Sequence, residues 1–263
     1  MPTAPILWQS RASTTSTGVT EMKKEDRFKN RPEVWDKRVK NYAPRLGLWP
    51  TEENLVNKYF IKKNATVIEI GCGAGRTAIP LAERGFKVVG IDILSKMINA
   101  ARQKAVEHQV TKKVKFVNAD VLKIPIKDNQ FDYAFVPYNS LDYIHPPEVR
   151  QRAIREIYRV LKPRGRLIHS FHNVLAIHGR LRFWYWTPRN IVGWLLSLNK
   201  NGGYRVNKDV WEFQTTVGAE KKRFELEKFT YFEHIFGRET HKATIGRLLQ
   251  WLKRAQVLMV FEK

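Results

Sequence analysis

Apolar residues follow two alternating periodicities through the middle of the chain, one typical of strands and one typical of helices. From Ala65 onward, short apolar runs of strand length are separated by longer segments whose apolar residues have helical spacing. The expected strands are 65–71, 87–92, 114–120, 131–138 and 165–173, and the expected helices are 75–85, 95–108 and 147–162. Strands that alternate with helices form a parallel sheet through right-handed crossovers. The pattern therefore predicts an α/β fold with a doubly wound, mostly parallel sheet.

The chain on either side of this repeating part differs in character. Residues 1–20 are polar and of low complexity, which predicts a disordered tail, and residues 21–64 have helical spacing, which predicts a helical extension. Residues 65–263 are expected to form the main domain, interrupted by an insertion at 174–223 that is rich in tryptophan and basic residues. After it, 224–236 and 257–263 have strand character, so we expect seven strands, the last one antiparallel.

A glycine-rich loop follows the first expected strand. Gly71, Gly73 and Gly75 alternate with other residues and open a helix, and the second strand ends in Asp92 about twenty residues later. Glycine lets a ligand approach the backbone closely, and a carboxylate at the second strand end can accept hydrogen bonds from ribose hydroxyls. This arrangement predicts a nucleoside-binding site.

The loop does not match the common phosphate-binding patterns. A dinucleotide fingerprint would place its third glycine where Arg76 stands, and the Gly-Lys-Ser/Thr of a P-loop is absent. Glu69 lies inside the strand just before the loop, where a carboxylate would repel phosphates. The site therefore suits a nucleoside ligand that carries positive charge.

Several segments in order carry a resemblance to a known family. "VIEIGCGAGRTAIPLA", "VVGIDILSKMINAARQKA", "VKFVNADVLKIPIKDNQFDYAFV" and "REIYRVLKPRGRLI" resemble successive motifs of the class I S-adenosylmethionine-dependent methyltransferases of the small-molecule type. The resemblance covers about residues 65–171 and returns weakly at 229–262. It implies a Rossmann-like sheet and S-adenosyl-L-methionine as cofactor.

The resemblance also implies cofactor contacts, position by position. Glu69 would lie near the methionine amino group, Gly71 and Gly73 would admit the cofactor to the backbone, and Asp92 would bind the ribose. Ile93 and Val121 would pack on the adenine, Asp120 would receive its exocyclic amine, and Asn139 would touch the methionine part. Tyr42 would close over the site. The implied cofactor-binding residues are thus Tyr42, Glu69, Gly71, Gly73, Asp92, Ile93, Asp120, Val121 and Asn139.

The acceptor should meet the residues that follow the fourth and fifth strands, because ligands of open α/β sheets lie outside the carboxyl ends of the strands. These stretches are "PYNSLDYIH" and "HSFHN". A sulfonium is a good leaving group, so positioning should dominate, and a base is needed only for some acceptors. The candidate catalytic residues are Tyr138, His145 and His172. His169 and His172 point to opposite faces of a strand, so no metal site is expected.

The charge leaves the kind of acceptor open. The chain has 47 Lys and Arg against 25 Asp and Glu, a net charge of +22. Between Arg150 and Arg205 there are twelve basic residues and one acidic residue. One hypothesis is a small-molecule acceptor under a basic, Trp-rich lid. The alternative is an RNA- or membrane-associated methyltransferase whose insertion holds nucleic acid or an anionic membrane surface. A cofactor-binding interaction module without catalysis is a third reading.

Other features bear on the compartment. A single cysteine, Cys72, excludes a disulfide framework, and the N-terminus lacks the pattern of a secretory signal. The longest apolar run, residues 191–198, is too short to span a bilayer, so no transmembrane segment is expected. We expect a cytoplasmic protein, with organelle targeting by the tail left open, and the sequence does not specify an oligomeric state.

Overall fold

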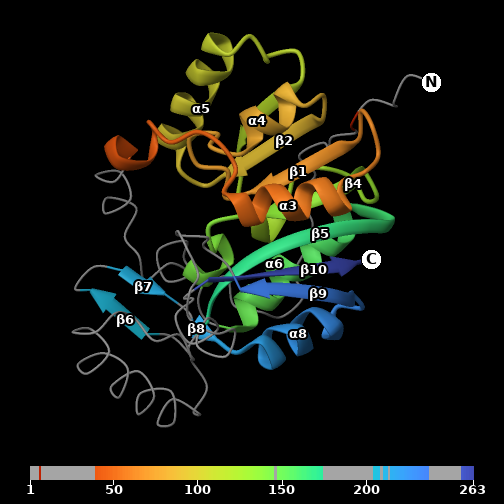
Figure 1. Ribbon diagram of the computed structural model, residues 1–263. Helices are drawn as coiled ribbons and strands as arrows, with labels where there is room; N and C mark the ends of the chain where they lie inside the picture. The colour runs from red at the N-terminus through yellow and green to blue at the C-terminus, as the bar shows by residue number, and fades with distance from the viewer. Residues whose placement is uncertain are drawn as a thin grey trace, which may run out of the picture.

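The computed structural model describes residues 39–144, 147–173, 204–207, 210–212, 214–236 and 256–263, together with Ile6. Figure 1 shows the arrangement of the elements. The strands are β1 (Thr66–Ile70), β2 (Lys87–Asp92), β3 (Val114–Asn118), β4 (Phe131–Val136), β5 (Leu161–Asn173), β6 (Tyr204–Asn207), β7 (Val210–Glu212), β8 (Gln214–Thr215), β9 (Thr230–Phe236) and β10 (Gln256–Glu262). The helices are α3 (Pro50–Tyr59), α4 (Ala78–Glu83), α5 (Ser95–Glu107), α6 (Pro147–Val160) and α8 (Val217–Leu226), with short 3-10 turns η1 (Val121–Lys123) and η2 (Ser140–Tyr143).

The main sheet has the strand order β3-β2-β1-β4-β5-β10-β9. Its first five strands are parallel, and β10 runs antiparallel to both β5 and β9. The short strand β8 adds a parallel pair at the end of β5, and β6 and β7 form a separate two-stranded sheet. The predicted Rossmann-like sheet of seven strands with an antiparallel last strand is therefore confirmed.

Helices cover the two faces of this sheet, and each face has its own apolar core. All five residues of β1 are buried, as expected for a strand with helices on both sides. Leu55 of α3 and Ile79 of α4 belong to one cluster, while Ile154 of α6 and Phe224 of α8 belong to the other. Figure 1 shows α3 and α6 on opposite sides of the sheet.

Some local predictions differ from the structure. The sequence favours a strand from residue 224, but α8 continues to Leu226 and β9 starts only at Thr230. Thr216 caps this helix, since its hydroxyl accepts a hydrogen bond from Ala219 N (3.2 Å), a signal hidden inside the predicted insertion. Residues 39–42 are helical as expected, and of the predicted tail only Ile6 is described, packed against the core. The predicted domain boundaries stay a prediction.

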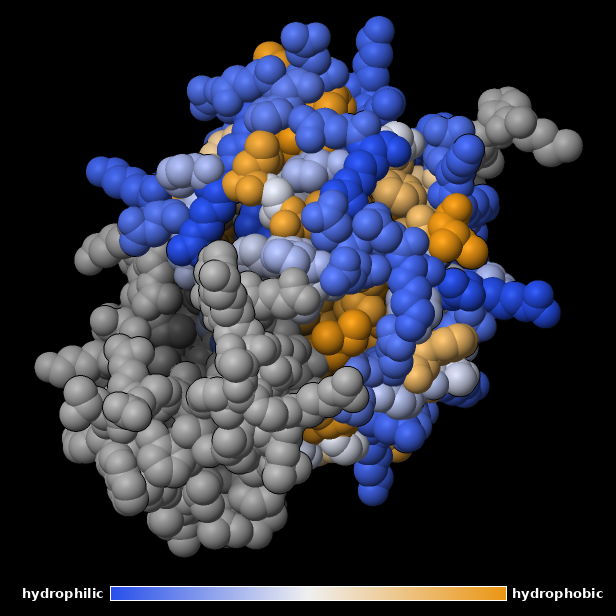
Figure 2. All heavy atoms as spheres, viewed as in Figure 1, coloured by the Kyte–Doolittle hydropathy of each residue, from blue (hydrophilic) through white to orange (hydrophobic). Residues whose placement is uncertain are grey.

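Among the described residues, no helix has both the length and the apolar character that a membrane span requires. Figure 2 shows a mostly hydrophilic surface on one face, with small apolar areas among charged side chains. This distribution fits the large excess of Lys and Arg in the sequence.

Candidate functional site

The glycine loop follows β1 directly and has an unusual backbone. Gly71, Gly73 and Gly75 all have positive φ angles of 67°, 52° and 80°, a region that favours glycine. A Cβ on Gly71 would lie 2.5 Å from Ser140 Oγ, so the bare backbone allows the chain after β4 to pack on the loop. A Cβ on Gly73 would meet no protein atom within 4 Å. Gly71 therefore serves packing, whereas Gly73 leaves space open for a ligand.

Asp92, the last residue of β2, holds the loop in place. Its Oδ2 accepts a hydrogen bond from Gly73 N (2.9 Å), and its Oδ1 accepts one from Leu94 N (2.9 Å). Burial raises the pKa of this carboxyl, while the backbone hydrogen bonds from Leu94 and Gly73 lower it. Each carboxylate oxygen can accept more than one hydrogen bond, so Asp92 can bind ribose hydroxyls while it anchors the loop.

Glu69 is a buried acid inside β1 with only one of its oxygens satisfied. Its side chain is 1 % exposed, and Oε1 accepts a hydrogen bond from Thr77 Oγ1 (2.6 Å). No donor among the described residues reaches Oε2. Burial raises the pKa of Glu69 to about 8. A buried acceptor without a donor calls for a ligand, and a cationic group would satisfy it best.

These groups open onto one cavity of about 490 Å³ at the carboxyl ends of β1, β2 and β4. Nine of the predicted site residues line it: Tyr42, Glu69, Gly71, Gly73, Asp92, Ile93, Asp120, Val121 and Tyr138. Asp120 caps η1 by accepting a hydrogen bond from Leu122 N (2.9 Å). Asn139 and His172 do not line the cavity, and His145 lies outside the described residues. The structure thus brings together most of the predicted cofactor residues.

The turn after β4 forms another wall of the cavity. Tyr138 and Asn139 both have left-handed backbones, with φ angles of 56° and 58°. Such residues cost about 1–3 kcal/mol each and persist where the surroundings hold them. The turn places the Tyr138 ring 5.5 Å from Tyr42 and 5.2 Å from Trp49, measured between ring centroids. Strain at this turn therefore serves to build an aromatic wall.

Two arginines on the same side of the cavity were not predicted from the sequence: Arg45, in the segment before α3, and Arg76, in the loop after β1. Arg45 Nη1 donates a hydrogen bond to Tyr138 Oη (2.8 Å), and Arg45 lines the cavity. Arg76 lines it too, but forms two short hydrogen bonds with the buried carboxylate of Glu52 (2.7 and 2.8 Å). The guanidinium of Arg45 forms no ion pair among the described residues. The signal for Arg76 was a charge at the start of the predicted helix 75–85, in a mostly apolar segment where a charge requires a partner.

His172 is held by hydrogen bonds on both sides of its ring. Its Nδ1 lies 3.0 Å from Asp142 Oδ2, and its Nε2 lies 2.7 Å from Asn139 Nδ2. The carboxylate accepts from Nδ1–H, so Nε2 is the acceptor for the amide. This arrangement uses both ring nitrogens and does not favour the predicted role of His172 as a base. In the described part of the chain, no group of His, Cys, Asp or Glu is placed to hold a metal.

The fold and the site define a class of protein: an α/β domain that binds a nucleoside with a cationic group. The acidic cavity residues Glu69, Asp92 and Asp120 disfavour a polyphosphate and suit hydroxyl, amine and ammonium groups. This conclusion follows from the geometry and agrees with the expectation from the sequence.

Comparison with known proteins shows which domain the middle of the chain resembles. Residues 67–165 match the model of the family described as "Methyltransferase domain". A 2-phytyl-1,4-naphtoquinone methyltransferase of Nostoc sp. is 34% identical over 115 residues, which are 42% of this chain and 48% of the relative. The sterol 4-C-methyltransferase strm-1 of Caenorhabditis elegans is 33% identical over 115 residues, which are 44% of this chain and 33% of the relative. Within residues 67–165, the chain carries a methyltransferase domain of the class I S-adenosylmethionine-dependent type.

The solved structures agree on the fold. A SAM-dependent methyltransferase of Methanosarcina mazei superimposes with a TM-score of 0.65 at 20% identity, covering 83% of this chain and 99% of the other. The curated relatives match over a shorter stretch, since the chain spans between a third and a half of their length. The match to the family model, residues 67–165, includes the glycine loop, Asp92 and Asp120.

Proposed function

We propose that the protein transfers a methyl group from S-adenosylmethionine to a small apolar acceptor. The observation that carries the proposal is the unsatisfied Glu69 Oε2 in the wall of a cavity that Asp92 and Asp120 also line. When bound, this cofactor supplies an electrophilic methyl group on a sulfonium. Everything else in the reaction then depends on how the protein holds the two reactants in line.

The residues present fit this cofactor. Glu69 Oε2 can accept a hydrogen bond from the methionine ammonium, and the open space above Gly73 can admit the ligand to the backbone. Asp92 and Asp120 offer carboxylate oxygens to the ribose hydroxyls and the adenine amine. Arg45 is a cation at the same cavity and can pair with the methionine carboxylate.

The acceptor side favours an apolar molecule. Pro137, Tyr138, Leu141, Tyr143 and Ile144 follow β4 and line the cavity with rings and aliphatic side chains. The named acceptor of the Nostoc relative, a phytyl naphthoquinone, is of this class. Of the two predicted catalytic residues that the structure describes, Tyr138 lines the cavity and His172 does not, and we assign Tyr138 the contact with the acceptor.

The insertion 174–223 is proposed to cover the acceptor side as a lid. Its strand β7 lies beside η2, the turn that carries Leu141 and Tyr143. A basic lid would also attract an anionic surface, which keeps RNA and membrane lipid as alternative acceptors to be tested.

Transfer of labelled methyl groups tests this function. The purified protein is incubated with methyl-labelled cofactor and a cell extract, and the label is then separated into organic-soluble, nucleic-acid and protein fractions. We expect label in the organic-soluble fraction and its loss in Gly73→Val, whose side chain would fill the open space. Gly47→Val is the matched control, because Gly47 also has a positive φ angle (105°), a Cβ there also meets no atom within 4 Å, and Gly47 does not line the cavity. Label confined to RNA would contradict the acceptor class, and no label anywhere would contradict the activity.

A further inference from the structure

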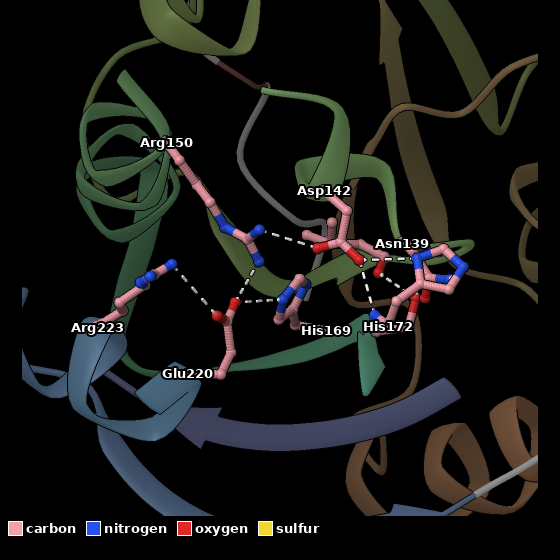
Figure 3. A network of polar contacts seen from close by, with 9 residues as sticks. Asn139, Asp142, Arg150, His169, His172, Glu220 and Arg223 are labelled. Carbon is pink, nitrogen blue, oxygen red and sulfur yellow. Dashed lines mark hydrogen bonds and ion pairs between the residues drawn. The ribbon is translucent and has the colours of Figure 1, made fainter. Parts of the chain in front are cut away.

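A network of buried polar side chains lies behind the acceptor wall of the cavity (Figure 3). The acceptor wall consists of the residues after β4 that line the cavity: Pro137, Tyr138, Leu141, Tyr143 and Ile144. Arg150 of α6 stands at its centre, between Asp142 of η2 and Glu220 of α8, and all three side chains are fully buried. Arg150 Nη1 lies 3.0 Å from Asp142 Oδ1, and Nη2 donates to Glu220 Oε1. One guanidinium therefore bridges two carboxylates from elements far apart in the sequence.

The Asp142 end of this network adjoins the cavity wall. Asp142 lies between Leu141 and Tyr143, which both line the cavity. Its Oδ2 also accepts hydrogen bonds from His172 N (2.7 Å) and from His172 Nδ1 (3.0 Å). The carboxylate thus ties η2 to β5 and to α6. It does so directly after the left-handed turn at Tyr138, a conformation that persists only when its surroundings fix it.

The Glu220 end of this network lies near the C-terminal end of the predicted insertion. Glu220 is in the first turn of α8, which follows β8 closely, and β8 pairs with the end of β5. Glu220 Oε1 lies 3.0 Å from His169 Nε2, and Glu220 Oε2 lies 3.8 Å from Arg223 Nη1. Arg150 therefore connects the acceptor wall to the helix that anchors the insertion at its C-terminal end.

The chemistry of this link suggests that its role is geometric. A buried ion pair is expensive to desolvate, and apolar side chains of similar volume often stabilise a fold as well or better. Apolar side chains cannot hold the two carboxylates in a fixed relative orientation. The planar guanidinium of arginine can, because its N–H groups point in fixed directions. The buried charge of Arg150 is therefore best explained by its effect on the position of η2, which carries Asp142.

We propose that Arg150 is a positioning residue for methyl transfer, which fixes the acceptor wall through Asp142 and links it to α8 through Glu220. The role in methyl transfer rests on the proposed function, whereas the contacts of Arg150 with Asp142 and Glu220 do not. Arg150 is fully buried and does not line the cavity, so it acts through Asp142 and not through a contact with cofactor or acceptor. Its loss should leave cofactor binding intact and loosen the residues that meet the acceptor.

Hydrogen exchange of the protein without ligand tests the link directly. The amides of Asn139, Asp142 and Ile144 are bonded to Ser170 Oγ, Asn139 O and Leu141 O, at 2.8, 2.9 and 3.1 Å. In Arg150→Met these amides should exchange at least about tenfold faster, because local opening sets the exchange rate. The amides of Gly71 and Cys72, which are bonded to Ile91 O, should keep their rates. Arg150→Lys keeps the positive charge, so it should fold. It lacks the planar guanidinium that contacts both carboxylates, so its amides in η2 should still exchange faster than those of the wild type.

Arg155→Met is the matched control. Arg155 also lies on α6 and pairs with Glu227, just beyond α8, but its side chain is 64% exposed and does not reach η2. It should leave exchange at η2 unchanged. Wild-type exchange at η2 in both Arg150 variants would overturn the proposal, and if Arg150→Met does not fold, Arg150→Lys decides alone.

Two functional readouts separate positioning from stability. Calorimetric affinity for S-adenosylhomocysteine should be equal in wild type and Arg150→Lys, while the rate of methyl transfer at saturating cofactor should fall. A parallel loss of cofactor affinity would mean a general structural role and would overturn the proposal. Failure of the wild type to bind S-adenosylhomocysteine would instead overturn the proposed function, since exchange at η2 is measured without ligand.

Discussion

Replacing Glu69 by Gln should change ligand binding and stability in opposite directions. In the protein without ligand, burial raises the pKa of Glu69 to about 8, so the side chain is mostly neutral at pH 7. A cationic ammonium beside Oε2 favours the ionised form, and binding is then coupled to release of a proton. The affinity for S-adenosylhomocysteine should rise with pH up to about 8, by up to about tenfold per unit.

The effect on stability has the opposite sign. The pKa of Glu69 in the folded protein, about 8, lies above its ordinary value of 4.5, so the folded state binds more protons than the unfolded chain between these values. Stability should therefore fall as the pH rises through this range, by up to about 1.4 kcal/mol per unit. Glu69→Gln cannot ionise, so at pH 9 and without ligand it should be more stable than wild type.

Calorimetry and thermal unfolding at pH 6, 7, 8 and 9 measure both effects. At pH 8, Glu69→Gln should lose about 1.5–3 kcal/mol of binding free energy, or roughly 10–150-fold in affinity. Binding of 5′-methylthioadenosine, which lacks the amino acid part, should not change. Glu53→Gln is the control, because its carboxylate is 45% exposed and pairs with Arg84. Equal affinity of Glu69→Gln and wild type for S-adenosylhomocysteine at pH 8 would refute the ammonium contact.

Three other expectations follow from single contacts. Gly71→Ala should destabilise the protein because its Cβ would lie 2.5 Å from Ser140 Oγ and because its φ angle of 67° is unfavourable for alanine; adding Ser140→Gly removes the close contact alone and should recover part of the melting temperature, and no recovery would contradict the close approach. Arg45→Met should weaken binding of S-adenosylhomocysteine but not of 5′-methylthioadenosine in calorimetry, and equal effects on both ligands would argue against the carboxylate contact. Hydrogen bonds from Lys62, Thr66 and Lys162 hold the pKa of Asp132 well below its usual range, so its contribution to stability is present above pH 4 and lost as the pH falls further; acid titrations of Asp132→Asn should lack this loss.

The sequence was most informative where chemistry and local pattern coincide. The run "VIEIG" before the glycines, and Asp92 at the end of the next strand, are close in sequence to the elements that position them. Parallel strands place their carboxyl ends at one edge of the sheet, which explains why the cofactor side of the cavity was predictable.

The acceptor side depends on contacts between distant residues, which no local pattern reveals. Arg150 appeared in the sequence as one of many arginines on an amphipathic helix, yet it is fully buried between Asp142 and Glu220. The role of Arg45 was also hidden in the sequence, because its hydrogen-bond partner Tyr138 lies 93 positions away. His172 was a plausible base by its place after the fifth strand, but Asp142 and Asn139 occupy both of its ring nitrogens. Such partners become visible only when the fold brings them together.

A crystal structure of the protein with S-adenosylhomocysteine tests the central claim most directly. The account predicts the ligand in the 490 Å³ cavity, with its ammonium within hydrogen-bond distance of Glu69 Oε2, its ribose hydroxyls at Asp92 and its adenine beside Asp120. A ligand bound elsewhere, or one in this cavity that leaves Glu69 Oε2 without a partner, would contradict it.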